Sequence, residues 1–381
     1  MKIMTEPSSD TPVVLRGMTW DHPRGVGGLR AADQLLRERH GVTVEWTARS
    51  LLAFGDQHVA DFASDFDILV IDHPHVPDAV EAGALLALDD SARLELESVG
   101  RSHESYRYRG RQWGFALDAA AQVGVFRPDR ADGVPVYWDD VLELARTGVV
   151  LWPWKPVDAF STFATLLAQL DAPLAAPGAF LDRTAAAQAI EFMVGLAEAV
   201  PDWCAEANPI DVAEALVGAD DYSVGVALFG YTNYSRSGFR PNLLAYDDIP
   251  SFDGRAGGST LGGAGIAVSA ATKHPALARA AALTLAGAEA QSTDYTLGGG
   301  QPANLRAWRS ESLGSLTHGF FRNTLRTLER AWVRPRVLGW PDLQLALSHL
   351  VRDAIASKTV DEDLLDAIER LPEKHLKEPI T

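Results

Sequence analysis

The fold is decided by the stretch Leu261-Gly262-Gly263-Ala264-Gly265-Ile266-Ala267-Val268-Ser269. Glycines have no Cβ, so the backbone can pass close to another segment or to a bound molecule. The apolar run that follows predicts a short buried strand. Pro275 suits the first turn of a helix, and the small apolar residues after it continue that helix to Gly287. The order is therefore a glycine-rich turn, a buried strand and an apolar helix.

Strand-like and helical stretches alternate near the start of the chain. Val13–Met18, Val42–Trp46 and Asp67–Asp72 are typical of strands, and apolar residues at helical spacing separate the first two. This order predicts a parallel α/β sheet. Ligands of such sheets bind beyond the carboxyl ends of the strands, where Trp20-Asp21-His22 and Asp72-His73 fall.

Length and charge restrict the class of protein. A chain of 381 residues exceeds the size of a single growing core, so two lobes are expected. No run of about 18 apolar residues is present, so we expect no membrane insertion. The net charge of −17 repels phosphate backbones and anionic lipid, which excludes nucleic acid as an expected partner.

The first residues predict where the protein works, and the cysteine count restricts disulfides and metal sites. Met1 to Thr11 lack the apolar segment of a signal peptide, so we expect a cytoplasmic protein from the sequence as written. If an export signal has been removed, the expected location is periplasmic or extracellular. Cys204 is the only cysteine, which excludes an internal disulfide and a cysteine-rich metal site.

Several short motifs, taken in their order along the chain, resemble those of a known protein family. They are the Tyr106–Asp118 hairpin with its turn at Gly110, the helix start Trp138-Asp139-Asp140, the strand Gly225–Tyr231, the turn Leu297–Pro302, and Arg334-Pro335. Together with the stretch from Leu261 to Gly287, they resemble family 1 of the bacterial extracellular solute-binding proteins. These are the receptor subunits of sugar-type ABC importers.

The resemblance implies an α/β fold of the two-lobe, periplasmic-binding-protein-like type II, with a ligand cleft between discontinuous lobes. The amino-terminal lobe would take residues 1–117 and 255–310, and the carboxyl-terminal lobe 118–254 and 311–381. A hinge near Asp118 and Tyr246-Asp247 would close the lobes on a ligand. The implied function is reversible binding of a small polar ligand, a sugar or polyol, for delivery to an ABC permease.

The predicted ligand contacts fall into three groups. Aromatic rings can stack on a sugar, although core packing is the alternative, and acidic and amide groups can accept hydroxyl hydrogen bonds, although helix capping is the alternative. Glycine backbone can approach the ligand. The predicted ligand-binding residues are Trp20, Trp154 and Tyr231 for stacking; Asp21, His22, Asp72, His73, Asp118, Asn233 and Gln301 for polar contacts; and Gly262, Gly263 and Gly299 for backbone contacts.

Other chemistries remain as alternatives. A cytoplasmic enzyme on the same fold would use His22, His73 and Asp118 as acid–base groups. A ligand sensor for a regulatory protein is a third hypothesis. No His-x-x-x-His or His-Glu-x-x-His spacing occurs, and Gly25–Gly28 lacks the last glycine of a dinucleotide fingerprint. We therefore expect no metal and no cofactor.

Overall fold

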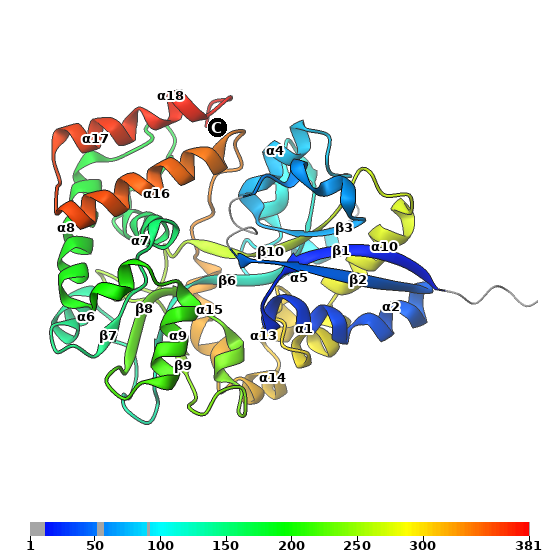
Figure 1. Ribbon diagram of the computed structural model, residues 1–381, viewed down its shortest axis with the longest axis horizontal. Coiled ribbons are helices and arrows are strands. Elements are labelled where there is room, and N and C mark those ends of the chain that lie inside the picture. The colour runs from blue at the N-terminus through cyan, green and yellow to red at the C-terminus, as the bar shows by residue number, and fades with distance from the viewer. Residues whose placement is uncertain (1–11, 52–56, 90–91, 381) are drawn as a thin grey trace, which may run out of the picture.

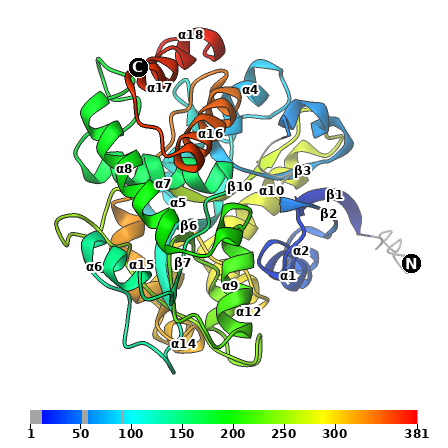
Figure 2. The same cartoon turned by 60° about the vertical axis from the view of Figure 1, so that its left-hand side comes forward.

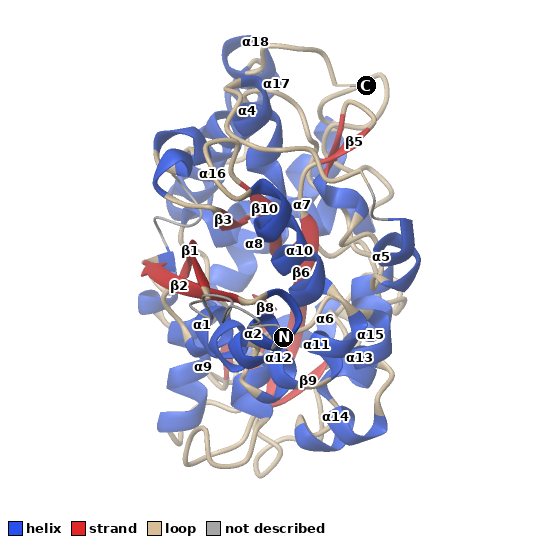
Figure 3. Ribbon diagram, turned by 90° about the vertical axis from the view of Figure 1, so that its right-hand side faces the viewer, coloured by secondary structure: helices blue, strands red, loops and turns tan. Residues whose placement is uncertain are grey.

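One mixed sheet runs through both lobes of the computed structural model, which describes residues 12–51, 57–89 and 92–380. The strand order is β2-β1-β3-β10-β6-β8-β7, and β9 pairs with β6 outside this path. Figure 3 shows β3, β10 and β6 in the middle of the molecule with helices on both sides, and β1 and β2 toward its left edge. The strands of the main sheet are β1 (Val13–Trp20), β2 (Val42–Arg49), β3 (Ile68–Ile71), β6 (Phe115–Phe126), β7 (Val150–Leu151), β8 (Val224–Phe229), β9 (Ala245–Asp247) and β10 (Leu261–Val268).

Strand β6 belongs to both lobes. Its first half pairs with β10, and its second half, from Gln122 to Phe126, pairs with β8 and β9. All twelve residues are buried, and α10 and α15 pack against the strand. In Figure 1, β6 and β10 lie side by side between the lobe on the right, here called the amino lobe, and the carboxyl lobe on the left. β6 runs toward the carboxyl lobe, and β10 runs antiparallel to it, back into the amino lobe.

The amino lobe confirms the predicted parallel sheet. β1 pairs in parallel with β2 and β3, while β10 runs antiparallel to β3. Leu15, Ile68 and Val70 are fully buried in this sheet. Its helices are α1 (Pro23–Ala31), α2 (Asp33–His40), α4 (Val76–Glu81), α5 (Ala92–Glu97), α10 (Pro275–Ala286), α11 (Ala288–Ser292) and α12 (Asp294–Leu297). Pro275 begins α10 and Gly287 caps it, as the sequence predicts.

The carboxyl lobe is mainly helical. α16 packs along α7, and Figure 2 shows the two helices side by side. Trp138, Trp152 and Trp340 are fully buried in its core. The helices are α6 (Trp138–Ala145), α7 (Pro156–Gln169), α8 (Arg183–Ala199), α9 (Pro209–Gly218), α13 (Leu305–Trp308), α14 (Glu311–Leu316), α15 (Phe320–Glu329), α16 (Trp340–Ser357), α17 (Glu362–Glu369) and α18 (Leu371–His375).

Short elements fill the connections. A two-stranded sheet forms the hairpin predicted around Gly110, with β4 (Arg107–Tyr108) antiparallel to β5 (Arg111–Gln112). Single 3₁₀ turns occur at η1 (Val59–Asp61), η2 (Ala63–Asp65), η3 (His73–His75), η4 (Glu104–Tyr106), η5 (Asp202–Ala205) and η6 (Thr232–Ser235).

Strand β6 and residues 259–261 cross between the lobes side by side, and the segment at Trp332 packs against them. The Ser259 hydroxyl donates to the carbonyl of Gln122 in β6 at 2.7 Å. The Trp332 N–H donates to the Ser259 carbonyl, and the Leu261 N–H donates to the Trp332 carbonyl. The chain therefore returns to the amino lobe at residues 259–261. The predicted hinge at Tyr246-Asp247 is wrong, because both residues pair with β6 inside the carboxyl half of the sheet.

Core packing follows the two lobes for most residues, although Val99 and Ala116 of the amino lobe pack in the carboxyl-lobe cluster. Two hydrophobic clusters lie in the amino lobe, and one of them extends through α10 to Tyr295. Ala303, Ala307 and Trp308 pack instead in the single large cluster of the carboxyl lobe. The predicted lobe boundaries at 117, 254 and 310 stay a prediction, and residues 1–11 and 381 of the predicted lobes lie outside the described residues.

We expect Gly263→Ala to lower the free energy of unfolding by about 2 kcal/mol. Gly263 has φ +100°, and a Cβ there would lie 2.3 Å from the Asp118 carbonyl oxygen. In the matched control Gly314→Ala, the new Cβ meets nothing in α14, so stability should hold or rise slightly. Urea unfolding of both variants measures the difference. Equal stability of the two would show that Gly263 is under no such constraint.

Candidate ligand-binding site

A cavity of about 170 Å³ lies between the lobes, beside β6 and β10. Both lobes and the strands that join them contribute to its wall. The lining residues are Trp20, Arg24, Leu51 and Asp72 from the amino lobe; Asp118, Ala120, Gly262, Gly263 and Ala264 from β6 and β10; and Lys155, Val157, Asp158, Ser161, Asn208, Pro209, Phe229, Tyr231 and Arg334 from the remaining chain.

Strand ends and helix starts place these side chains. Trp20 ends β1, and Asp72 follows β3, so both lie at the carboxyl edge of the parallel strands. Across the cavity, Asp158 lies in the first turn of α7, and Asn208 caps α9 through its side-chain oxygen. This is the sheet edge at which α/β proteins bind ligands.

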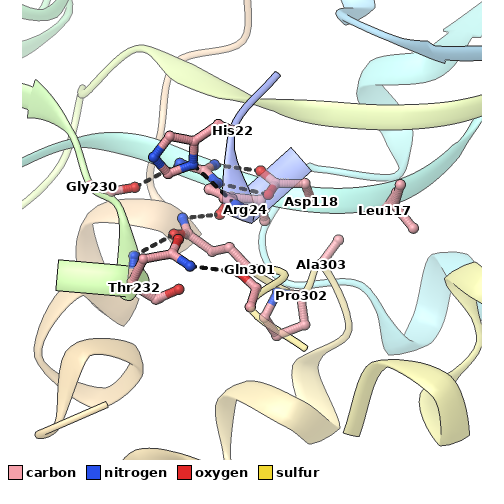
Figure 4. Close-up of polar contacts among 12 residues, drawn as sticks. His22, Arg24, Leu117, Asp118, Gly230, Thr232, Gln301, Pro302 and Ala303 are labelled. Carbon is pink, nitrogen blue, oxygen red and sulfur yellow. Dashed lines mark hydrogen bonds and ion pairs between the residues drawn. The ribbon is translucent and has the colours of Figure 1, made fainter. Parts of the chain in front are cut away.

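Arg24 ties the two lobes together at one wall of the cavity. Its Nε donates to Asp118 Oδ2 at 2.8 Å, its Nη2 to Asp118 Oδ1 at 2.5 Å, and its Nη1 to the Gly230 carbonyl at 2.8 Å (Figure 4). The guanidinium also lies 4.5 Å from the ring centroid of Tyr231. Burial acts to lower the pKa of Arg24, but the Asp118 carboxylate outweighs it and raises the pKa. Arg24 is therefore charged, and its N–H groups donate to Asp118 and to the Gly230 carbonyl.

A second ion pair neutralises Asp72. Arg334 Nη2 donates to both carboxylate oxygens of Asp72, at 2.8 and 2.7 Å. Burial acts to raise the pKa of Asp72, but Arg334 outweighs it and holds the pKa well below its usual range. Both arginines of the cavity wall are thus paired with an aspartate of the same wall.

Asp158 differs from these two aspartates. The residue is 3% exposed, and its Oδ2 has no hydrogen-bond partner among the described residues. Burial raises the pKa of Asp158 to about 7; Lys155 acts to lower it, and Asp211 adds to the rise. A buried carboxyl group without a partner is costly for the fold, so its place on a cavity wall points to a ligand.

The structure brings six of the predicted ligand-binding residues to the cavity wall. They are Trp20, Asp72, Asp118, Tyr231, Gly262 and Gly263. For these residues, direct contact with a ligand stays a prediction.

Three other predicted residues form a hydrogen-bond network next to the wall. Gln301 accepts from the Thr232 N–H at 3.0 Å and donates to the Ala119 carbonyl at 2.8 Å, and Figure 4 shows it beneath Arg24. Asn233 Nδ2 donates to the Gly299 carbonyl at 3.2 Å. These bonds tie the turn after β8 to the loop after α12.

Asp21 and Trp154 also lie off the cavity wall. Asp21 is exposed at the end of β1. Trp154 is buried, and its ring stacks on Trp152 with a centroid distance of 6.2 Å. Their predicted ligand contacts stay predictions.

The two predicted histidines have local partners. His22 Nδ1 accepts from the Arg24 N–H and caps α1, and its ring packs edge-on against Tyr231. His73 is buried beside Asp72, with Nδ1 3.2 Å from the carboxylate. Burial, together with the smaller effect of a nearby arginine, lowers the pKa of each histidine to about 4. Both are weak bases, and neither lines the cavity.

Sequence reasoning missed the part of the wall built by α7 and α9. Lys155, Val157, Asp158, Asn208 and Phe229 were not among its candidates. A usable signal was present, because Pro156 and Pro209 each mark a helix start. Polar residues at a helix start that follows a strand, as α7 follows β7, are candidates for the same sheet edge, whereas α9 follows a helix and a 3₁₀ turn.

The described residues contain no group of three or more His, Cys, Asp or Glu side chains placed to hold a metal ion. Within the same residues, no helix combines the length and the apolar character that a bilayer crossing requires.

Comparison with known proteins identifies the family. The family described as bacterial extracellular solute-binding protein matches residues 29–292. The chain belongs to this family. Membership supports a binding function over the enzyme hypothesis, and the family is described as extracellular. No curated protein sequence matches this chain.

Solved structures with the same fold are distant in sequence. The maltose-bound MalE3 of T. maritima has a TM-score of 0.81 at 18% identity, over 95% of this chain and 99% of that one. A solute-binding protein of Thermotoga lettingae bound with alpha-D-tagatose has 0.80 at 13%, over 95% and 99%. The cyclic alpha-maltosyl-1,6-maltose binding protein of Arthrobacter globiformis has 0.73 at 15%, over 94% and 98%. These matches establish the two-lobe, type II fold predicted from the motifs.

We expect Arg24→Met to lower the free energy of unfolding by about 3–5 kcal/mol, because Asp118 is left buried without its partner. The double variant Arg24→Met/Asp118→Leu should recover most of that loss. Urea unfolding at pH 7 of the wild type, both single variants and the double variant measures the coupling. Additive losses would show that the two side chains act independently.

We expect Asp158→Asn to stabilise the ligand-free protein at pH 8, by at most about 4 kcal/mol. The folded pKa of about 7 lies above the unfolded value. The cost of ionising the buried carboxyl group is therefore complete above pH 7 and disappears below about pH 4. Thermal unfolding should show the gain at pH 8 and a smaller gain at pH 4.5. The exposed control Asp132→Asn should change neither value.

Proposed function

We propose that this solute-binding protein captures a carbohydrate reversibly in the cavity between its lobes and delivers it to an ABC-type permease. The observation that carries the proposal is the composition of the cavity wall, where Trp20, Phe229 and Tyr231 lie with Asp158 and Ser161. Aromatic faces stack on the apolar face of a sugar ring, and the polar groups bind its hydroxyls.

Closure of the lobes is part of the proposed binding cycle. Two crossing segments lie side by side at Gln122 and Ser259, so a small change of backbone angles there rotates one lobe against the other. Rotation toward the closed form surrounds the ligand and excludes water. The Arg24 contacts to Asp118 and Gly230 keep the α1 side of the cavity in place.

The first ligands to test are sugars. Solved structures with the same fold hold maltose and alpha-D-tagatose, and a cyclo/maltodextrin-binding protein of this fold is complexed with maltotetraose. We propose the same chemical class for this chain because its cavity combines aromatic rings with the unpaired acceptor Asp158 Oδ2.

We also propose that the protein works outside the cytoplasmic membrane, as the description of its family states. The cytoplasmic location predicted from residues 1–11 stays a prediction. Fractionation of the native host, with an antibody against the protein, separates the two locations.

Calorimetric titration against glucose, galactose, tagatose, maltose and maltotetraose tests the proposed function. We expect at least one sugar to bind and to be recovered unchanged. Trp20→Leu removes the aromatic face but keeps an apolar side chain in the core, so it should weaken binding about tenfold. The partly exposed Trp203, which does not line the cavity, supplies the control Trp203→Leu, and its affinity should equal that of the wild type.

Two outcomes contradict the proposal. One is a panel in which no sugar binds the wild-type protein at pH 8.5. The other is conversion of a bound sugar into product, which would restore the enzyme hypothesis. Equal weakening by Trp20→Leu and Trp203→Leu would place the sugar elsewhere on the protein.

A further inference from the structure

Among the acidic side chains of the cavity wall, Asp158 differs because one of its carboxyl oxygens accepts no hydrogen bond from the described residues. Asp118 accepts two hydrogen bonds from Arg24, and Asp72 accepts two from Arg334. Asp158 is more than nine-tenths buried, and Oδ2 has no partner among the described residues. Because Asp158 belongs to the cavity wall, a ligand in the cavity can supply the hydrogen-bond partner that its carboxyl group lacks within the fold.

The fold positions Asp158 without satisfying it. Pro156 begins α7 and Asp158 follows in the first turn, a place where a negative charge is favoured by the helix dipole. The N-cap residue Lys155 makes no side-chain capping bond, and Asp158 Oδ2 has no hydrogen-bond partner among the described residues. Burying this carboxyl group without a partner therefore lowers the stability of the fold. Such a cost is typical of residues that are kept for binding.

We propose that the Asp158 carboxylate binds a pair of neighbouring hydroxyl groups on the sugar and thereby makes sugar affinity depend on pH. This inference rests on the proposed function. The two oxygens of an ionised carboxylate accept from two hydroxyls at once, whereas the protonated acid loses one of these acceptors. A proton and the sugar therefore compete for Asp158.

The surrounding charges favour a neutral ligand over a cation. Lys155 lies one helical turn before Asp158 and acts on it electrostatically, so it would also repel an ammonium group. From α9, Asp211 opposes ionisation of Asp158. Tyr231, whose pKa burial raises to about 12, stays neutral throughout the relevant range. The Arg24–Asp118 and Arg334–Asp72 pairs complete the charged groups of the wall.

The direction of the pH effect follows from the same contacts. Burial raises the pKa of Asp158 to about 7 in the empty cavity. A sugar that prefers the carboxylate binds most tightly above that pH, and its affinity falls by roughly tenfold per pH unit well below it. Between pH 8.5 and pH 5.5, we expect a loss of affinity of about 30-fold.

Calorimetry with the sugar panel at pH 5.5, 6.5, 7.5 and 8.5 tests this inference. The wild type should show the 30-fold change. Asp158→Asn should bind at least tenfold more weakly at pH 8.5, with no remaining pH dependence. Asp211→Asn is the matched control: Asp211 is exposed and lies outside the cavity wall. It should keep the affinity at pH 8.5 and move the midpoint of the profile to lower pH.

The outcomes separate this inference from the proposed function. No binding of any sugar at pH 8.5 overturns both. Binding with equal affinity at all four pH values overturns the role of Asp158 alone, as does a pH dependence that survives in Asp158→Asn. Tighter binding of protonated glucosamine than of glucose at pH 5.5 would overturn the assignment of a neutral ligand. Circular dichroism of each variant at each pH confirms that the compared proteins are folded.

Discussion

Strand β6 is the constraint on which the two lobes and the cavity between them depend. Its backbone is used on both edges, first by β10 and then by β8 and β9. Each lobe therefore completes its sheet only through the same strand, and the change of partner near Gln122 brings the crossings together. The cavity forms beside this change, where glycines of β10 leave room for Phe229 and for the Asp118 backbone.

The acidic groups of the cavity wall are of two kinds: Asp72 and Asp118, which are paired with arginines, and Asp158, which lacks a hydrogen-bond partner at Oδ2 among the described residues. Arg24 and Arg334 each use an aspartate of the wall as a partner, so these four side chains hold segments in place as well as lining the cavity. Asp158 is left without such a partner in the first turn of α7. A fold that tolerates this cost retains an acceptor for a ligand, at the expense of stability when the cavity is empty.

The local sequence was sufficient to predict several helices and strands. The alternation from Val13 to Asp72 predicts the parallel strands, and Pro275 and Gly287 predict both ends of α10, because these signals act through the backbone of their own segment. The hinge at Tyr246-Asp247 was wrong because strand pairing with β6, far away in sequence, decides where a crossing ends. The ion pair of Arg24 with Asp118 could not be predicted from the local sequence, because the two residues are 94 positions apart.

The sequence by itself determined the fold class, the order of strands and helices, and the family to which the chain belongs, since periodicity and short motifs carry that information locally. Only the tertiary structure decided which polar residues are available to a ligand. Asp72, Asp118 and Asp158 are equivalent as residue types, and their different roles arise from partners that the fold brings beside them. Hydrogen-bond partners and burial depend on distances through space, and spacing along the chain does not encode them.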